Sequence, residues 1–331
     1  MIKTSVIRKR VVPAMDKIPK FSDLPLRKED PHHSAWGLYG ENDELGFLNR
    51  LTEDVVLEAA REIKTGQRIS LDWPLDAQGD IPFFGRQVFH KHVYQKPPRI
   101  VNDDVWTFNT QSSSQWDGLR HFAYQKEQKF YNGVTLEDIH GDHATNVNGI
   151  HAWSEKGIVG RGILLDWHSW RLKNNVSYEP FKTGSIPLSQ LHAVAKDQGV
   201  EIKFGDILLI RSGYLATYNA MGKDELSALS KVVPPTFTGV EQSEEMLEWI
   251  WENFSAVAGD QPSFECWPSQ KDYFLHEVLL AGWGCPIGEL FDLEALAEHC
   301  TKEKRWSFFL TSKVCNVPGG VASPPNILAI F

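Results

Sequence analysis

Long apolar runs, clustered cysteines and an excess of positive charge are all missing from this sequence. No stretch approaches the ~18 consecutive apolar residues that a membrane-spanning helix needs. The formal net charge is −9, and no segment carries a stripe of basic residues, so the chain lacks the electrostatic signature of a nucleic-acid binder. We therefore expect a protein whose partners include neither a membrane nor a nucleic acid.

The cysteines stand late in the chain and never in a Cys-x-x-Cys pair. They are Cys266, Cys285, Cys300 and Cys315. A zinc knuckle or a redox dithiol needs closely spaced pairs, and a secreted domain more often uses its cysteines in structural bridges. The basic N-terminus also lacks the apolar run of a signal peptide. These features predict free thiols and a cytoplasmic location.

Three common catalytic signatures are absent as well. The sequence has no Gly-x-Ser-x-Gly, the motif around the nucleophile of many serine hydrolases. It has no Gly-x-Gly-x-x-Gly, which disfavours a dinucleotide enzyme, and no Walker A motif to support phosphoryl transfer. Nor does any cysteine lie in a motif of a cysteine hydrolase.

The composition is that of a globular protein with a real core, since 42% of the 331 residues are hydrophobic and 23% are charged. No repeat, low-complexity segment or linker divides the chain. We predict one α/β domain with mixed sheets over residues 36–331.

Residues 1–35 alternate basic residues with prolines. This pattern predicts an N-terminal arm that either embraces a partner subunit or frays.

Strands and helices are expected to alternate through most of the domain. The apolar spacing predicts helices over 53–64, 187–198, 241–254 and 293–300, and strands over 69–73, 162–167, 207–211, 255–258 and 306–312. Thr52 is expected to cap the first helix. Residues 75–135 are rich in Gly, Pro, Ser and Asn and are predicted to be irregular. Because long loops inside a compact domain are often functional, we look there first for chemistry.

That loop contains four side chains with metal or proton chemistry at steps of four, two and four residues. They are Gln111, Gln115, Asp117 and His121. The carboxylate and imidazole are common metal ligands, whereas each amide offers only a neutral carbonyl oxygen. On chemistry alone this is a weak signal, because loops often contain these residue types.

The same stretch resembles the signature His-x-Gly-Thr-His-x-Asp-x-Pro-x-His of the cyclase family, the family of kynurenine formamidase and isatin hydrolase. Asp117 and His121 match its aspartate and last histidine. Gln111 and Gln115 stand where its first two histidines would be, serines replace Gly-Thr, and Leu119 replaces the proline. This Gln-for-His form is similar to the variant in trans-dienelactone hydrolase, a lactone-opening member of the superfamily.

A second part of the signature, a histidine followed about a dozen residues later by a glutamate, resembles His276 and Glu289. The resemblance covers roughly residues 34–331. It implies the swivelling β/β/α fold of the family and a homodimer or homotetramer. It also implies a metal-dependent hydrolase that opens a lactone, a lactam or an aryl formamide.

The resemblance further implies the roles of individual residues. The metal ligands would be Gln111, Gln115, Asp117, His121, His276 and Glu289. The expected ion is Zn or Mn, with Mg as a further candidate. Amide oxygens are harder ligands than imidazole and therefore favour the harder ions. His121 would act as general base toward a metal-activated water, with His276 and Glu289 completing the catalytic set.

Two further residues are candidates for substrate binding, each with a structural alternative. Arg120 could bind a substrate carboxylate through its planar guanidinium or form an ion pair within the fold. Trp116 could face the ligand or point into the core. His90 and His92 would share one face of a strand and could join a metal site.

Two other functions stay open at this point. One is a metal-free lyase, isomerase or cyclase on the same fold, in which His121 and Glu289 do acid–base work. The other is a small-molecule binding relative without turnover.

Overall fold

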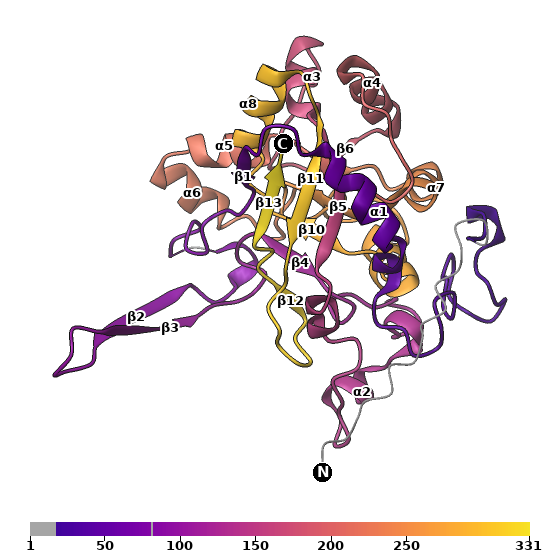
Figure 1. The fold of residues 1–331 in the computed structure, drawn as a ribbon, viewed down its shortest axis with the longest axis horizontal. Coiled ribbons are helices and arrows are strands. Elements are labelled where there is room, and N and C mark those ends of the chain that lie inside the picture. The colour runs from indigo at the N-terminus through magenta and orange to yellow at the C-terminus, as the bar shows by residue number, and fades with distance from the viewer. Residues whose placement is uncertain (1–17, 81) are drawn as a thin grey trace.

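The computed structural model describes residues 18–80 and 82–331, and its centre is a mixed β-sheet (Figure 1). Among these residues, nine strands join in the order β1-β13-β11-β5-β7-β9-β10-β4-β12. The four strands β5, β7, β9 and β10 run parallel, and the flanking pairs are antiparallel. The prediction of an α/β fold with mixed sheets is confirmed.

The strands of the sheet are short, and most of them lie where apolar runs predicted them. They are β1 (Arg68–Ser70), β4 (Gln115–Asp117), β5 (Ile158–Leu165), β7 (Asp206–Ile210), β9 (Phe254–Gly259), β10 (Ile287–Glu289), β11 (Ser307–Ser312), β12 (Ala322–Ser323) and β13 (Ile327–Ile330). A separate parallel pair is formed by β6 (Gly184–Ile186) and β8 (Thr238–Val240).

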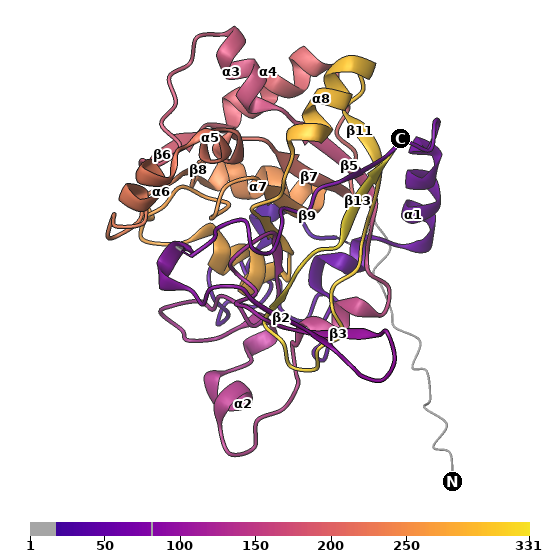
Figure 2. The same cartoon turned by 90° about the vertical axis from the view of Figure 1, so that its left-hand side faces the viewer.

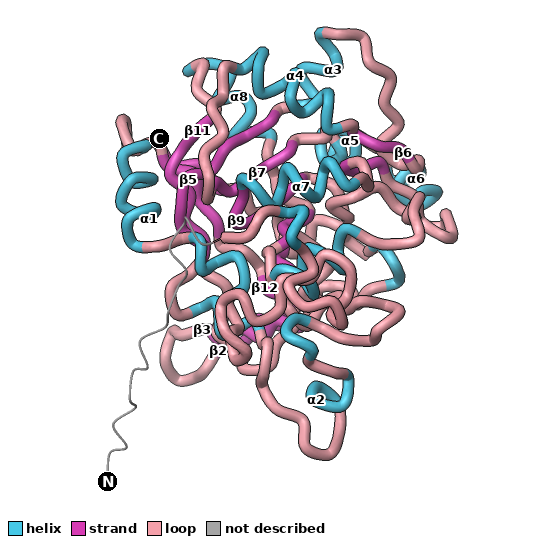
Figure 3. Tube along the Cα trace, turned by 90° about the vertical axis from the view of Figure 1, so that its right-hand side faces the viewer, coloured by secondary structure: helices cyan, strands magenta, loops and turns pink. Residues whose placement is uncertain are grey.

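Helices cover both faces of the sheet. They are α1 (Glu53–Ala59), α2 (Leu136–His140), α3 (Trp167–Lys173), α4 (Leu188–Gln198), α5 (Tyr214–Ala220), α6 (Lys223–Leu229), α7 (Glu244–Asn253) and α8 (Glu294–Glu303). In Figure 2, α1 lies on one side of the strands and α5 to α7 on the other. The tube in Figure 3 shows that loops make up much of the half of the molecule opposite α3, α4 and α8.

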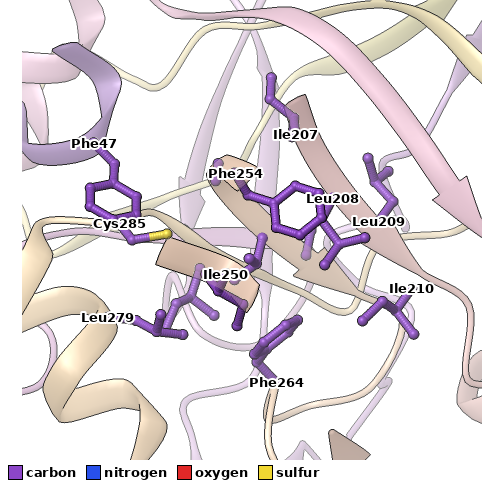
Figure 4. Close-up of a cluster of buried hydrophobic side chains, with 14 of the residues drawn as sticks. Phe47, Ile207, Leu208, Leu209, Ile210, Ile250, Phe254, Phe264, Leu279 and Cys285 are labelled. Atoms are coloured by element: carbon purple, nitrogen blue, oxygen red, sulfur yellow. The ribbon is translucent and has the colours of Figure 1, made fainter. Parts of the chain in front are cut away.

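The core is built on the parallel strands, which are buried on both faces. All five residues of β7 and all six of β9 are buried, as expected for strands that read as continuous apolar runs. Figure 4 shows Leu208 and Phe254 of these strands packed with Phe264 and Ile250. This core packs around the parallel strands. One of them, β10, extends into the candidate site.

The predicted helix over 53–64 is shorter in the structure. Thr52 caps α1 as predicted, because its Oγ1 accepts from Val55 N at 3.4 Å. The α-helix ends at Ala59, and a 3-10 turn over Ala60–Glu62 follows it. The helix predicted over 241–254 begins at Glu244, after the cap Ser243.

The predicted arm spans residues 1–35, and its residues 1–17 lie outside the described part of the chain. Residues 18–35 lie against the body of the same chain. Phe21 is buried, Pro19 O accepts from Trp251 Nε1 at 2.9 Å, and Ala35 N donates to Gly282 O at 3.0 Å.

The stretch predicted to be irregular contains a β-hairpin. Strands β2 (His90–Gln95) and β3 (Asn102–Thr107) pair antiparallel and project from the body (Figure 1). Nearly every residue of both strands is exposed. A strand without a buried face has no need of alternating apolar residues, so the hairpin leaves no period-two signal. His90 and His92 lie exposed on it, in neither of the metal-ligating clusters found among the described residues.

None of the helices in residues 18–80 and 82–331 has the length and apolar character to cross a membrane.

Candidate metal and active site

The site begins with the pairing of β4 and β10 at the edge of the sheet. Their antiparallel register sets Gln115 directly opposite Glu289, and Gln115 Nε2 donates to Glu289 Oε2 at 2.9 Å. Because side chains two residues apart in a strand share a face, Asp117 lies on the same face as Gln115. Both residues are fully buried.

Gln111 and His121 flank β4 and turn back toward Asp117. Gln111 Nε2 donates to Asp117 Oδ1, and His121 Nε2 lies 3.8 Å from Asp117 Oδ2. A tight turn places His121 there, since the backbone N–H of His121 donates to Gly118 O at 3.0 Å. A Cβ at Gly118 would stand 2.7 Å from Val321 O, so this turn needs glycine.

His276 enters the site as the N-cap residue of a π-helix over Glu277–Gly282. Its Nδ1 lies 2.5 Å from Glu265 Oε2, and its Nε2 lies 3.1 Å from Glu289 Oε1. Glu265 Oε1 also accepts from the His276 amide at 3.1 Å. The imidazole is therefore held between two buried carboxylates, and a chain of contacts runs from Glu265 through His276 and Glu289 to Gln115.

Burial and charge shift the proton affinities of these groups. Burial raises the pKa of Glu289 to about 7, and the negative charge of Asp117 adds to the effect. Burial alone would lower the pKa of His276, but the carboxylates of Glu265 and Glu289 outweigh it and raise that pKa well above its usual value. Burial lowers the pKa of His121.

Three buried oxygen atoms in this cluster have no hydrogen-bond partner among the described residues. They are Gln111 Oε1, Gln115 Oε1 and Asp117 Oδ2. Ligand atoms of Asp117, His121 and His276 also lie within 4.8 Å of one another. Since buried polar atoms are nearly always paired, three unpaired oxygens beside two imidazoles fit a divalent cation of the harder or borderline kind.

Comparison with known proteins identifies the family of the chain. A family profile described as "Putative cyclase" matches residues 51–266. The chain belongs to this cyclase family. The resemblance inferred from the two halves of the signature is therefore confirmed.

Solved structures similar to this cyclase-family chain cover most of its length. A crystal structure described as a novel cyclase shares 28% identity, covers 90% of this chain and 99% of its own, and has a TM-score of 0.79. Isatin hydrolase A from Ralstonia solanacearum has 13% identity, coverages of 85% and 98%, and a TM-score of 0.57. Isatin hydrolase A from Labrenzia aggregata bound to benzyl benzoate has 13% identity, the same coverages and a TM-score of 0.54.

The two isatin hydrolases show that the cyclase-family chain shares their fold, and at this identity they show no more. A search of curated proteins found no match.

Two residues that the sequence did not single out contact the candidate site of this cyclase-family chain. Glu265 is fully buried and holds His276. Arg86 donates from Nη1 to Gln111 O at 2.5 Å. Burial lowers the pKa of Arg86, and the charges of Glu289 and Asp117 oppose that shift. Neither residue is part of the signature, and neither carries a sequence pattern that would have singled it out.

Aromatic rings continue outward from His276. The Phe122 ring lies 5.4 Å from the His276 ring and 5.2 Å from Phe274. Trp267 stacks on Phe274 at 5.7 Å, and Phe84 meets Trp267 edge-on at 6.5 Å. Arg86 lies over the Phe84 ring at 4.8 Å. Below, we call Phe122, Phe274, Trp267 and Phe84 the aromatic wall.

The two residues predicted to bind substrate lie elsewhere. Trp116 alternates with Gln115 and Asp117 in β4, so it points to the opposite face. It is fully buried there, bonding Ser312 Oγ at 2.9 Å. Arg120 donates to the backbone oxygens of Thr145, Val147 and Gly319 at 2.6 to 3.0 Å. These contacts favour the structural alternative for both side chains, Trp116 in the core and Arg120 as a clamp on the backbone.

Proposed function

We propose that this cyclase-family protein is a metal-dependent hydrolase that opens a small cyclic ester or amide. The observation that supports this most directly is the set of three buried oxygens without hydrogen-bond partners, on Gln111, Gln115 and Asp117. The amide nitrogen of Gln111 donates to Asp117, and that of Gln115 donates to Glu289. Each amide oxygen is therefore left free to bind a cation.

Asp117, Gln111, Gln115 and His121 would hold the cation, with Zn or Mn preferred and Mg as the harder alternative. A cation bound there lowers the pKa of a bound water and polarises a carbonyl group. Two amides in place of imidazoles weaken the hold on Zn relative to an all-histidine site, because amide oxygen is a poorer zinc ligand.

Proton transfer would fall to His276 and Glu289. Glu265 holds Nδ1 of the imidazole, which fixes the ring and directs Nε2 toward Glu289. In the proposed reaction the water oxygen joins the carbonyl carbon and the ring C–O or C–N bond breaks. The pair takes the proton from the water and passes it to the departing ring heteroatom. The product is an open-chain hydroxy acid or amino acid.

The surroundings favour a flat substrate with a negative charge. The aromatic wall offers apolar faces beside His276, and such faces bind planar rings. Arg86 supplies a positive charge next to this wall, and a guanidinium pairs well with a carboxylate. We therefore propose an aromatic or unsaturated lactone or cyclic amide with a carboxylate.

The test combines metal content with a substrate screen. Protein purified without chelator is analysed for Zn and Mn, then assayed with lactones, cyclic amides and aryl formamides. We expect turnover that is lost in Asp117→Asn together with the metal of this site. The control Asp54→Asn, an exposed change on α1, should leave both intact. Full activity in Asp117→Asn would overturn the proposal.

A metal-free lyase, isomerase or cyclase is the second candidate, and one observation favours it. Both amide nitrogens donate to the carboxylates of Asp117 and Glu289, so the polar cluster is partly satisfied without a cation. In that reaction His121 and Glu289 would do the acid–base work. Activity that survives exhaustive chelation would select this candidate over the hydrolase.

We also propose that the chain forms homo-oligomers and works in the cytoplasm. The projecting hairpin β2–β3 exposes Ile100, Val105 and Trp106, which are 91%, 52% and 55% exposed. It carries basic and acidic side chains together, such as Lys96 and Asp103, so a second copy of the same surface offers complementary charges. All four thiols are free, which supports a reducing compartment.

A further inference from the structure

A second group of metal-ligating side chains lies outside the candidate active site and shares no residue with it. His32 and His33 follow one another in the segment before Trp36, and Glu244 opens helix α7. Ligand atoms of the three lie within 4.8 Å of one another. His33 Nε2 stands 2.6 Å from Glu244 Oε2.

The backbone at this point is arranged to bring two neighbouring imidazoles together. His33 has a φ of +60°, a left-handed conformation that residues other than glycine adopt rarely. In an extended chain, consecutive side chains would point to opposite sides. Here the two rings lie 3.7 Å apart, centre to centre.

Contacts from the body of the protein hold this conformation. The carbonyl of His32 accepts from the Tyr124 hydroxyl at 2.8 Å, and that of His33 accepts from Trp283 Nε1 at 2.7 Å. The Phe21 ring stacks on His33 at 4.5 Å. These contacts fix the backbone of both histidines and the ring of His33 before any ligand arrives.

The His33 side chain is 9% exposed, yet neither of its ring nitrogens has a hydrogen-bond partner among the described residues. Nε2 lies within ion-pair distance of Glu244 Oε2, at 2.6 Å, but the contact does not meet hydrogen-bond geometry. A buried imidazole without partners costs free energy, and its neutral form is a common metal ligand. The ring thus faces its two neighbours with coordination capacity unused.

We infer that His32, His33 and Glu244 bind a Zn²⁺ ion. Two imidazoles and one carboxylate are a donor set that zinc accepts, with water in the fourth position. His32 is exposed and the Glu244 side chain is 52% exposed, so the ion can enter from solvent. Bound there, it cross-links the segment before Trp36 to helix α7 and stabilises their packing.

The test counts zinc in four full-length proteins after equilibration with Zn²⁺ and gel filtration. These are the wild type, Glu244→Gln, Asp117→Asn and the double variant. We expect Glu244→Gln to hold one equivalent less than the wild type, whatever the active site holds. The double variant should hold one less than Asp117→Asn. This difference separates failure of this inference from failure of the proposed function.

A titration with Zn²⁺ in the Asp117→Asn protein gives the affinity of the second site. We expect His32→Ala, a change at an exposed residue, to weaken binding by more than about tenfold. His143→Ala, at another exposed histidine, should not change it. Zinc binding that is equal in His32→Ala, Glu244→Gln and their parent would overturn the inference and leave a plain contact between His33 and Glu244.

Discussion

At the scale of single residues, alternation along a short strand decides which side chains reach the site. In β4, Gln115 and Asp117 face the cluster and Trp116 faces the core. Glu265 matters at the same scale, because it bonds both the backbone amide and Nδ1 of His276. A carboxylate in this position fixes the tautomer and orientation of an imidazole.

Replacing Glu265 by glutamine should therefore slow turnover more than it weakens substrate binding. We expect Glu265→Gln to lower kcat by about 10²- to 10⁴-fold with little change in KM, and to change the ¹⁵N shifts of the His276 ring. Glu241→Gln, which alters a carboxylate that accepts from Leu188 N, serves as control. Equal losses in both variants would point to general damage to the fold.

The amide at Gln115 should set the choice of metal. In Gln115→His an imidazole replaces an amide oxygen, and zinc prefers imidazole nitrogen to amide oxygen. We expect the affinity for Zn²⁺ to rise by about tenfold or more, equivalent to ~1.4 kcal/mol. Competition with a chromophoric chelator measures it, and Gln87→His, at an exposed position, is the matched control. An unchanged affinity would remove Gln115 from the ligand set.

At the scale of elements, the hairpin β2–β3 stands out because it has no buried face within the chain. An isolated two-stranded hairpin is marginally stable in water. Exposed apolar side chains at its tip and along β3 fit the proposed contact with a second copy. Cover from a second copy would stabilise both hairpins.

Charges placed on this hairpin should dissociate the oligomer. We expect the double variant Ile100→Glu, Val105→Glu to sediment as a monomer where the wild type sediments as a dimer or tetramer. Buried carboxylates without partners are strongly unfavourable. Leu57→Glu changes an equally apolar side chain on α1, 67% exposed, and should leave the mass unchanged. A wild-type monomer, or a variant of wild-type mass, would contradict this role.

At the scale of the whole molecule, the sheet joins segments that are far apart in the sequence. The β4–β10 pair joins residues about 170 positions apart, and its parallel partner β9 anchors it in the core. Cations at the two sites would each bind the folded chain and not the unfolded one, so metal binding should be coupled to global stability.

Removal of metal should therefore lower the melting temperature. Each site at a free cation concentration 100 times its Kd contributes about 2.7 kcal/mol, which corresponds to roughly 4 °C for a chain of 331 residues. Differential scanning calorimetry before and after chelation measures the shift. The Asp117→Asn, Glu244→Gln double variant should show none. A shift of the same size in that variant would mean that the chelator acts elsewhere.

Much of the fold could be read from the sequence, because buried parallel strands and amphipathic helices leave clear patterns. The strand at Asp206–Ile210 and the cap at Thr52 are examples. The hairpin was missed, since solvent on both faces removes the alternation that marks a strand. The candidate site was predicted from the two halves of a family signature, whereas Arg86 and Glu265 lie outside it and carry no pattern of their own.

The sequence by itself determined the family, the α/β class and the segments that carry the candidate ligands. Only the tertiary structure decided that Gln115 and Glu289 lie face to face, that Glu265 holds His276, and that Trp116 lies in the core. The physical reason is that strand register and long-range pairing are set by packing of the whole sheet. Local residue patterns specify elements, and they do not specify which distant side chains meet.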